Sequence, residues 1–116
     1  MNDQTTTVSD LRQMVKRFVD DREWEQFHAP KNVSMALAIE AAELMEHFQW
    51  LSTEESRQID ADPAKREAVG EELADIICYA LALANTLDLD VSETLRAKMK
   101  KNEAKYPVER YRGTFE

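Results

Sequence analysis

The stretch "DPAKREAVGEELADIICYALALANTL", residues 62–87, holds the longest helical pattern in the chain. Asp62 can cap a helix that has Pro63 at its first position, where a proline is tolerated because its missing N–H has no helical partner. Apolar residues then recur every three or four positions, as on the buried side of a helix. They are Val69, Leu73, Ile76, Ile77, Ala80, Leu81 and Ala84. The stretch therefore predicts a long core helix.

Two further helices are predicted on the N-terminal side of this stretch. The first runs from Ser9 or Asp10, either of which can cap it, to about residue 22 or 23. Its apolar stripe consists of Leu11, Met14, Val15, Phe18 and Val19. The second runs from about residue 32 or 33 to residue 51, after a loop that contains Pro30.

The C-terminal side adds a last helix, and the composition agrees with an all-helical chain. "STEE" at residues 52–55 is a capping-box pattern that predicts a short helix. Asp90 can cap the last helix, which must end before Pro107. Only two glycines and three prolines occur in 116 residues. We predict one all-α domain over residues 1–116, like a four-helix bundle and oligomeric, with residues 1–8 and 108–116 flexible.

Charge and cysteine content exclude several classes of function. The formal net charge of -8 argues against binding to nucleic acid polymers, which requires a basic face. The single cysteine, Cys78, excludes an intrachain disulfide and a zinc–thiolate cluster, and its apolar surroundings predict an ordinary buried thiol. The start "MNDQTTTVSD" is too polar for a secretory signal, and the apolar run at residues 76–84 is too short to span a bilayer. We expect a soluble cytoplasmic protein.

Three carboxylates border the apolar side of the second helix, in "ALAIEAAELMEHFQW" at residues 36–50. A step of three residues falls roughly 60° short of a full helical turn, so Glu40 and Glu43 are neighbours on one face. Glu46 has rotated further and lies at the edge of that face. "EELADI" repeats the geometry in the long helix, where Glu72 and Asp75 are three residues apart.

Two explanations of these acids remain open on spacing alone. Most such pairs in acidic helical proteins belong to a solvated surface. Two antiparallel helices would instead bring four acids together, and a divalent cation would remove their repulsion. An all-oxygen ligand set favours Mg²⁺, with Mn²⁺ as a substitute, over the iron of Glu-x-x-His bundles.

Other residues are candidates for binding a ligand. The segment "WEQFHAPKN" carries Trp24, Phe27 and His28, and the second helix ends near Trp50. These rings could stack on a base or could seal the edge of the core, and sealing is the interpretation we prefer for Phe27. Tyr79 lies one turn after Asp75 and could reach a phosphate or a sugar. Lys98 and Asn102 share a face of the last helix, which could grip phosphates or could be a solvated basic face.

Several of these segments together resemble a known family. Glu40, Glu43, Glu72 and Asp75 match the Glu-x-x-Glu and Glu-x-x-Asp motif of the all-α nucleotide pyrophosphohydrolases, the MazG-like enzymes. "REWEQFHAPKN", "LMEHFQW" and "KMKKNEAKYP" resemble the dCTP pyrophosphatase branch of that family, and the similarity covers about residues 22–107.

The resemblance implies hydrolysis of a nucleoside triphosphate between its α- and β-phosphates, with Mg²⁺ bound by the four acids of the motif. Glu40 or Glu43 would be the catalytic base, and the substrate, dCTP or a modified dCTP, would contact Trp24, His28, Trp50, Tyr79, Lys98 and Asn102. The resemblance also implies a homodimer or homotetramer and a role in cleaning the nucleotide pool. The alternatives are a non-catalytic helical oligomer or binding protein, and the same chemistry on a non-cytosine or damaged nucleotide.

Overall fold

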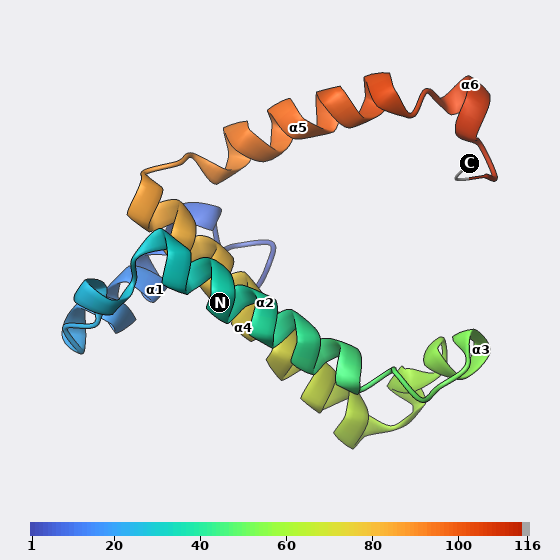
Figure 1. Cartoon of the computed structure of the whole chain (residues 1–116), viewed down its shortest axis with the longest axis horizontal. Helices are drawn as coiled ribbons and strands as arrows, with labels where there is room; N and C mark the ends of the chain where they lie inside the picture. Colours follow the sequence, from blue (N-terminus) through green and yellow to red (C-terminus); the bar gives the residue numbers. More distant parts are fainter. Residues whose placement is uncertain (115–116) are drawn as a thin grey trace.

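The computed structural model describes residues 1–114, and these residues form helices joined by turns, without a strand (Figure 1). This confirms the prediction of an all-α chain. None of the helices in that range is long and apolar enough to cross a membrane. The elements in chain order are α1 (Val8–Asp21), the 3₁₀ helix η1 (Glu25–Phe27), α2 (Pro30–Glu46), α3 (Thr53–Ser56), the 3₁₀ helix η2 (Ile59–Ala61), α4 (Pro63–Leu87), α5 (Val91–Lys105) and α6 (Val108–Tyr111).

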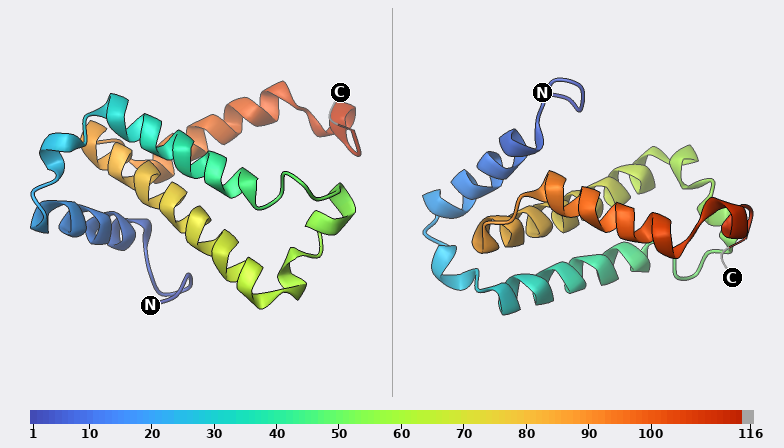
Figure 2. Two further views of the ribbon diagram at one scale, coloured as in Figure 1. Left: turned by 60° about the horizontal axis from the view of Figure 1, so that its bottom comes forward. Right: turned by 90° about the horizontal axis from the view of Figure 1, so that it is seen from above.

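Helices α2 and α4 form a long antiparallel hairpin, and α1 packs against the C-terminal half of α4 (Figures 1 and 2). The core is small because only five apolar side chains of the described chain are buried. They are Val19 of α1, Val33 of α2, and Leu81, Ala82 and Ala84 of α4. The hairpin is therefore the part of the fold on which a site can be built.

Side-chain caps fix the ends of the helices, largely as predicted. Asp62 accepts hydrogen bonds from the backbone N–H groups of Ala64 (3.1 Å) and Lys65 (3.3 Å), and Asp90 accepts one from Glu93 (2.8 Å). Ser52 begins α3 with the predicted capping box. The predicted cap of α1 is wrong, because Thr7 is the N-cap. Its hydroxyl accepts a hydrogen bond from the Asp10 N–H and its own N–H donates to the Asp10 carboxylate, which makes a second capping box.

The bounds of α2 also differ from the prediction. The helix begins at Pro30, since a proline is well suited to the first helical position. It ends at Glu46, where the chain turns away through a bond from the backbone N–H of Phe48 to the carbonyl of Met45, 2.9 Å long. The prediction that α2 continues to residue 51 is therefore wrong, and this moves Trp50 off the helix.

At its C-terminal end the chain holds a short helix that the sequence did not suggest. Residues 108–116 carry no apolar period, yet Val108–Tyr111 form α6 within the segment predicted to be flexible. The Tyr106 and Tyr111 rings meet edge to face, with centroids 5.2 Å apart. The predicted flexible segment also includes residues 115–116, which lie outside the described residues.

Helix α5 projects away from the other long helices (Figure 1; Figure 2, left). The radius of gyration is 17.1 Å, whereas a compact chain of this length has one of about 13 Å. Part of the predicted buried side of α4 is also exposed, because no described element of the same chain covers Leu73 (49% exposed) or Ile77 (45% exposed). The four-helix arrangement is thus not completed within one chain.

Polar contacts hold α1 on α4 at the end from which α5 leaves. The Arg12 guanidinium donates from Nε to Asn85 Oδ1 (3.0 Å) and from Nη2 to the carbonyl of Ala84 (3.4 Å). The Asn85 amide donates in return to the carbonyl of Arg12 (3.1 Å). These bonds fix α1 and the aromatic segment after it beside α4.

Candidate active site

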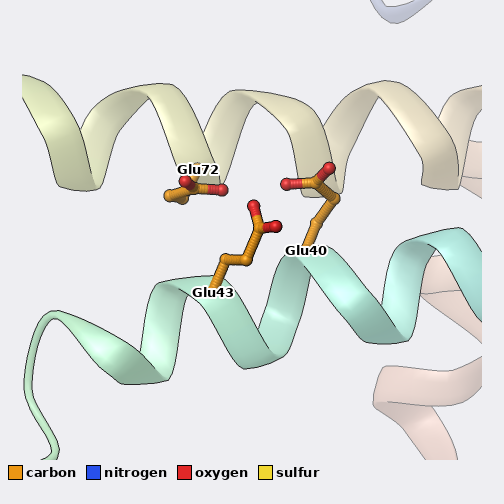
Figure 3. Close-up of side chains that lie close together, drawn as sticks. All are labelled: Glu40, Glu43 and Glu72. Atoms are coloured by element: carbon orange, nitrogen blue, oxygen red, sulfur yellow. The ribbon is translucent and has the colours of Figure 1, made fainter.

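Three of the predicted acids meet between α2 and α4 (Figure 3). Glu40 and Glu43 extend from α2 toward α4, and Glu72 extends from α4 toward them. One carboxylate oxygen from each lies within 4.8 Å of the others. The three-residue spacing places both glutamates on the side of α2 that packs against α4. These three residues are called the acid cluster below.

The acid cluster concentrates negative charge in a partly buried place. Oε2 of Glu40 and Oε2 of Glu72 are shielded from solvent and have no hydrogen-bond partner among the described residues. The pKa of Glu40 is raised from 4.5 to about 7, mainly by the adjacent Glu72 side chain, with added effects of burial and of the Glu43 carboxylate. Shielded, unpaired carboxylates are costly in a folded protein. An arrangement of this kind persists when a ligand compensates for the charge.

The residues of the acid cluster fit a hard divalent cation. Each offers a carboxylate oxygen, the ligand type that Mg²⁺ and Mn²⁺ prefer. In residues 1–114 the ion pairs are Lys16–Asp20 and Arg57–Glu54, so no lysine or arginine neutralises the cluster there. Asp75 is not part of the acid cluster, but its charge also raises the pKa of Glu40. A cation at the cluster would therefore have Asp75 as a fourth nearby acid.

A cavity of about 450 Å³ lies beside the acid cluster. Glu40 and Asp75 form part of its acidic wall, and Tyr79 lies next to them on α4. Trp24 and His28, from the segment between α1 and α2, also line it. The cavity thus joins carboxylates to aromatic and imidazole groups, a combination suited to a ligand with a charged part and a flat ring.

Contacts within α1 and the turn after it orient Trp24 toward the cavity. The Phe18 and Trp24 rings meet edge to face, with centroids 5.7 Å apart. The Arg22 guanidinium lies 3.8 Å from the centre of the Phe18 ring. Glu23 adopts a left-handed backbone conformation (φ 54°), which turns the chain sharply after α1. Trp24 therefore depends on Phe18 and on this turn for its position.

Tyr79 and Cys78 are both neutral in the cavity wall near pH 7. Burial raises the pKa of the Tyr79 phenol, and Glu40 adds to the shift. Burial likewise raises the pKa of the Cys78 thiol, followed by the effect of Asp75. Tyr79 can therefore donate a hydrogen bond to an anionic ligand. Cys78 is half-buried, not fully buried as predicted, because α1 leaves one side of α4 open at this point.

Three of the predicted substrate-binding residues lie outside the cavity of the single chain. Trp50 is 88% exposed in the turn after α2, since that helix ends before reaching it. Lys98 and Asn102 lie on α5, which projects away from the hairpin. Glu46 is exposed at the end of α2 and is not part of the acid cluster, in agreement with its rotation on the helix.

Sequence reasoning did not identify five other residues of the cavity wall. The candidates above share that wall with Val15, Phe18 and Val19 of α1 and with Cys78 and Ala82 of α4. Their helical spacing marked Val15, Phe18 and Val19 as apolar, and this signal does not distinguish a core residue from a cavity wall. The packing of α1 on α4 decides between the two roles.

Comparison with known proteins places the chain in a family. The model of the MazG-like family matches residues 35–114, so the chain belongs to that family. The chain is also 41% identical over 108 residues to dCTP pyrophosphatase 1 of Bos taurus and 38% identical over 102 residues to that of Homo sapiens. These matches cover 93% and 88% of this chain but only 64% and 60% of the relatives, so the chain spans less than two thirds of their length.

A solved structure with a similar fold is known from an archaeon. It is a crystal structure of a pyrophosphatase from Archaeoglobus fulgidus DSM 4304, with a TM-score of 0.80 and 34% sequence identity. The similarity covers 92% of this chain and 98% of that one. The overall path of this chain is therefore similar to that of the archaeal protein.

Proposed function

We propose that this protein is a Mg²⁺-dependent nucleoside triphosphate pyrophosphohydrolase that acts on dCTP or a modified dCTP. The observation that carries the proposal is the acid cluster, with its shielded unpaired oxygens, beside a cavity lined by Trp24 and His28. Membership of the MazG-like family and the names of the dCTP pyrophosphatase 1 relatives support the same activity.

The reaction would use water and no protein nucleophile. The oxygen of a water molecule bonds to phosphorus while the P–O bond between the α- and β-phosphates breaks, and the products are the monophosphate and pyrophosphate. Glu40 or Glu43 would orient this water and accept its proton. Glu40, Glu43, Glu72 and Asp75 would hold Mg²⁺, or Mn²⁺ in its place. The bound cation would neutralise negative charge on the phosphate oxygens.

The cavity beside the acids would receive the nucleoside. Trp24 would stack on the base, an interaction worth roughly 1–3 kcal/mol. His28 would supply a hydrogen bond to the base. Stacking alone accepts any base, so such a hydrogen bond is needed to distinguish one base from another. The neutral phenol of Tyr79, which lines the cavity together with Glu40 and Asp75, would donate to a phosphate or a sugar hydroxyl.

The remaining candidates fit an assembly of several chains. We propose that the protein works as a homodimer or homotetramer in the cytoplasm and removes unwanted triphosphates from the nucleotide pool. The apolar residues left exposed on α1, α4 and α5 support self-association. Trp50, Lys98 and Asn102 would then reach the substrate when the chains are assembled.

Product analysis tests the activity directly. The protein is incubated with each common dNTP and with 5-methyl-dCTP, with Mg²⁺ or with EDTA, and the products are separated by ion exchange. We expect the monophosphate and pyrophosphate in equal amounts, with cytosine substrates preferred and no turnover in EDTA. No cleavage, or release of orthophosphate and the diphosphate, would refute the proposal. Preference for another base would keep the chemistry and change the substrate.

A further inference from the structure

The cavity beside the acid cluster is built from two parts of the fold. Its acids, Glu40 and Asp75, lie on α2 and α4, which pack against each other as the hairpin. Helix α1 and the segment after it contribute Val15, Phe18, Val19, Trp24 and His28. The placement of α1 against α4 therefore determines the shape of the part of the cavity that would hold the base.

Helix α1 is held on α4 by one apolar and one polar anchor. Val19 is the only side chain of α1 that is buried. Roughly two turns earlier in the helix, the Arg12 guanidinium donates to Asn85 Oδ1 (3.0 Å) and to the carbonyl of Ala84 (3.4 Å). The Asn85 amide donates back to the carbonyl of Arg12 (3.1 Å). The contact of α1 with α4 is much smaller than that of α2 with α4, so each anchor matters.

The polar anchor differs from the other side-chain hydrogen bonds of the chain. Arg12 and Asn85 are 73 positions apart, and both side chains are half-buried. Every other side-chain hydrogen bond described within residues 1–113, apart from that of Arg12 to Ala84, joins residues at most four positions apart. Apolar burial is non-directional, whereas hydrogen bonds require a defined geometry. The pair therefore fixes where α1 lies on α4.

Asn85 is also close to the cavity without being part of its wall. It lines a small neighbouring pocket of about 110 Å³. That pocket and the cavity have four lining residues in common, which are Val15, Val19, His28 and Ala82. A change in the position of α1 at Asn85 therefore reaches the cavity directly, through side chains that belong to both.

From these observations we propose that Arg12 and Asn85 are positioning residues, which hold α1 on α4 and thereby set the width of the cavity for the nucleoside. Neither side chain lines the cavity, so both act through α1 and the aromatic segment that follows it. The acid cluster lies on the hairpin and does not depend on the pair. The effect on substrate binding rests on the proposed function, whereas the placement of α1 does not.

Steady-state kinetics of Asn85→Leu test the effect on binding. Leucine has a similar size but forms no hydrogen bond with Arg12. We expect KM for the preferred dNTP to rise about tenfold and kcat to stay within about twofold, because the loss falls on binding and not on the acids. Gln13→Leu is the matched control, since its amide bonds only to Ser9 of the same helix (3.2 Å), and it should keep both constants. An unchanged KM in Asn85→Leu, or a loss confined to kcat, would overturn the proposal.

Three further variants test whether the two residues act as a pair. Asn85→Asp keeps an oxygen that accepts from Arg12 and should hold KM near the wild-type value. Arg12→Met removes the guanidinium and should raise KM as Asn85→Leu does. The double variant of Arg12→Met with Asn85→Leu should be no worse than either change alone, because both remove the same interaction. Independent, multiplying increases in KM would overturn the pair.

Hydrogen exchange tests the placement of α1 without any turnover. In Asn85→Leu without nucleotide, the amides of α1 should exchange about tenfold faster, because this helix opens more easily when its polar anchor is lost. The amides of α2 should keep their wild-type rates. Unchanged exchange of α1 would overturn the placement, whatever the kinetics show. A wild-type protein that cleaves no triphosphate would refute the proposed function, and faster exchange of α1 in Asn85→Leu would still support the placement.

Discussion

The α2–α4 hairpin is rich in apolar residues and helix α5 is rich in charged ones, and the two also differ in what they contact. The hairpin buries Val33 and Leu81 and brings three carboxylates together. Helix α5 has a regular cap at Asp90, yet both of its large apolar residues, Leu95 and Met99, are exposed. An apolar stripe thus predicts that a helix has a buried side, and it does not tell which chain covers that side.

The difference also separates the two halves of the proposed site. The acidic half of the site lies within one chain, because α2 and α4 pack against each other and carry all three residues of the acid cluster. The basic half is on a helix that the rest of its chain does not hold. If the hairpin is the stable, metal-binding unit, substitutions in it should have large effects, and substitutions in α5 should leave the hairpin unchanged.

The largest effect is expected from removing one acid of the cluster. Glu43→Gln removes a charged ligand and should lower turnover of the preferred dNTP by roughly 100-fold or more, since even groups behind the ligands contribute 10–100-fold. Initial rates at saturating Mg²⁺ give the comparison. Glu46→Gln makes the same change on exposed α2 surface and should keep wild-type activity. Equal rates for the two variants would remove the metal-site assignment.

The core of the hairpin should be sensitive to truncation. Leu81→Ala removes a buried side chain where α4 packs, and we expect a loss of about 2–4 kcal/mol in the free energy of unfolding. Met45→Ala on the exposed side of α2 should change it by less than about 0.5 kcal/mol. Chemical denaturation measures both. A Leu81→Ala variant as stable as Met45→Ala would contradict the packing of the hairpin.

The stability of the metal-free protein should depend on pH through Glu40. Its pKa is about 7 in the folded protein and 4.5 in the unfolded chain, so the folded state holds this proton more tightly. The stabilisation is fully present below about pH 4.5 and is lost as the pH rises through about 7. Melting temperatures in EDTA should therefore fall across this range. Mg²⁺ should restore them at neutral pH, and Glu40→Gln should remove the trend; the same trend in Glu40→Gln would exclude this cause.

The smallest effect compares the caps of α4 and α5. Asp62→Ala should lower the free energy of unfolding of the hairpin by about 1 kcal/mol. Asp90→Ala removes an equivalent cap from α5 and should change the hairpin by less than about 0.5 kcal/mol, because unconnected parts of a structure respond independently. Hydrogen exchange of the α2 and α4 amides measures both effects on the hairpin. The protein is diluted until it is monomeric, so that contacts between chains do not contribute. Equal effects would show that α5 is part of the same unit.

The sequence predicted those features that depend on neighbouring residues. Capping residues such as Ser52, Asp62 and Asp90 act over a few positions, so the starts of three helices could be read directly. The three-residue spacing of Glu40 and Glu43 predicted that both face α4, and their meeting with Glu72 followed from the antiparallel hairpin.

Features that depend on distant contacts could not be predicted in this way. The end of α2 is set by the turn at Phe48, and without this turn Trp50 would have stayed on the helix. The exposure of Leu73 and Ile77 depends on which helices cover α4, and periodicity carries no information on that. The same limit applies to Lys98 and Asn102, whose position relative to the acids depends on how chains assemble.

Binding of a divalent cation by the acid cluster can be tested in crystals grown with Mn²⁺ and a non-hydrolysable dCTP analogue. Anomalous scattering locates the metal independently of its ligands. We predict an anomalous peak in direct coordination with Glu40, Glu43 and Glu72, next to the phosphates of the analogue. A nucleotide bound in the cavity with no metal at these carboxylates would contradict the account.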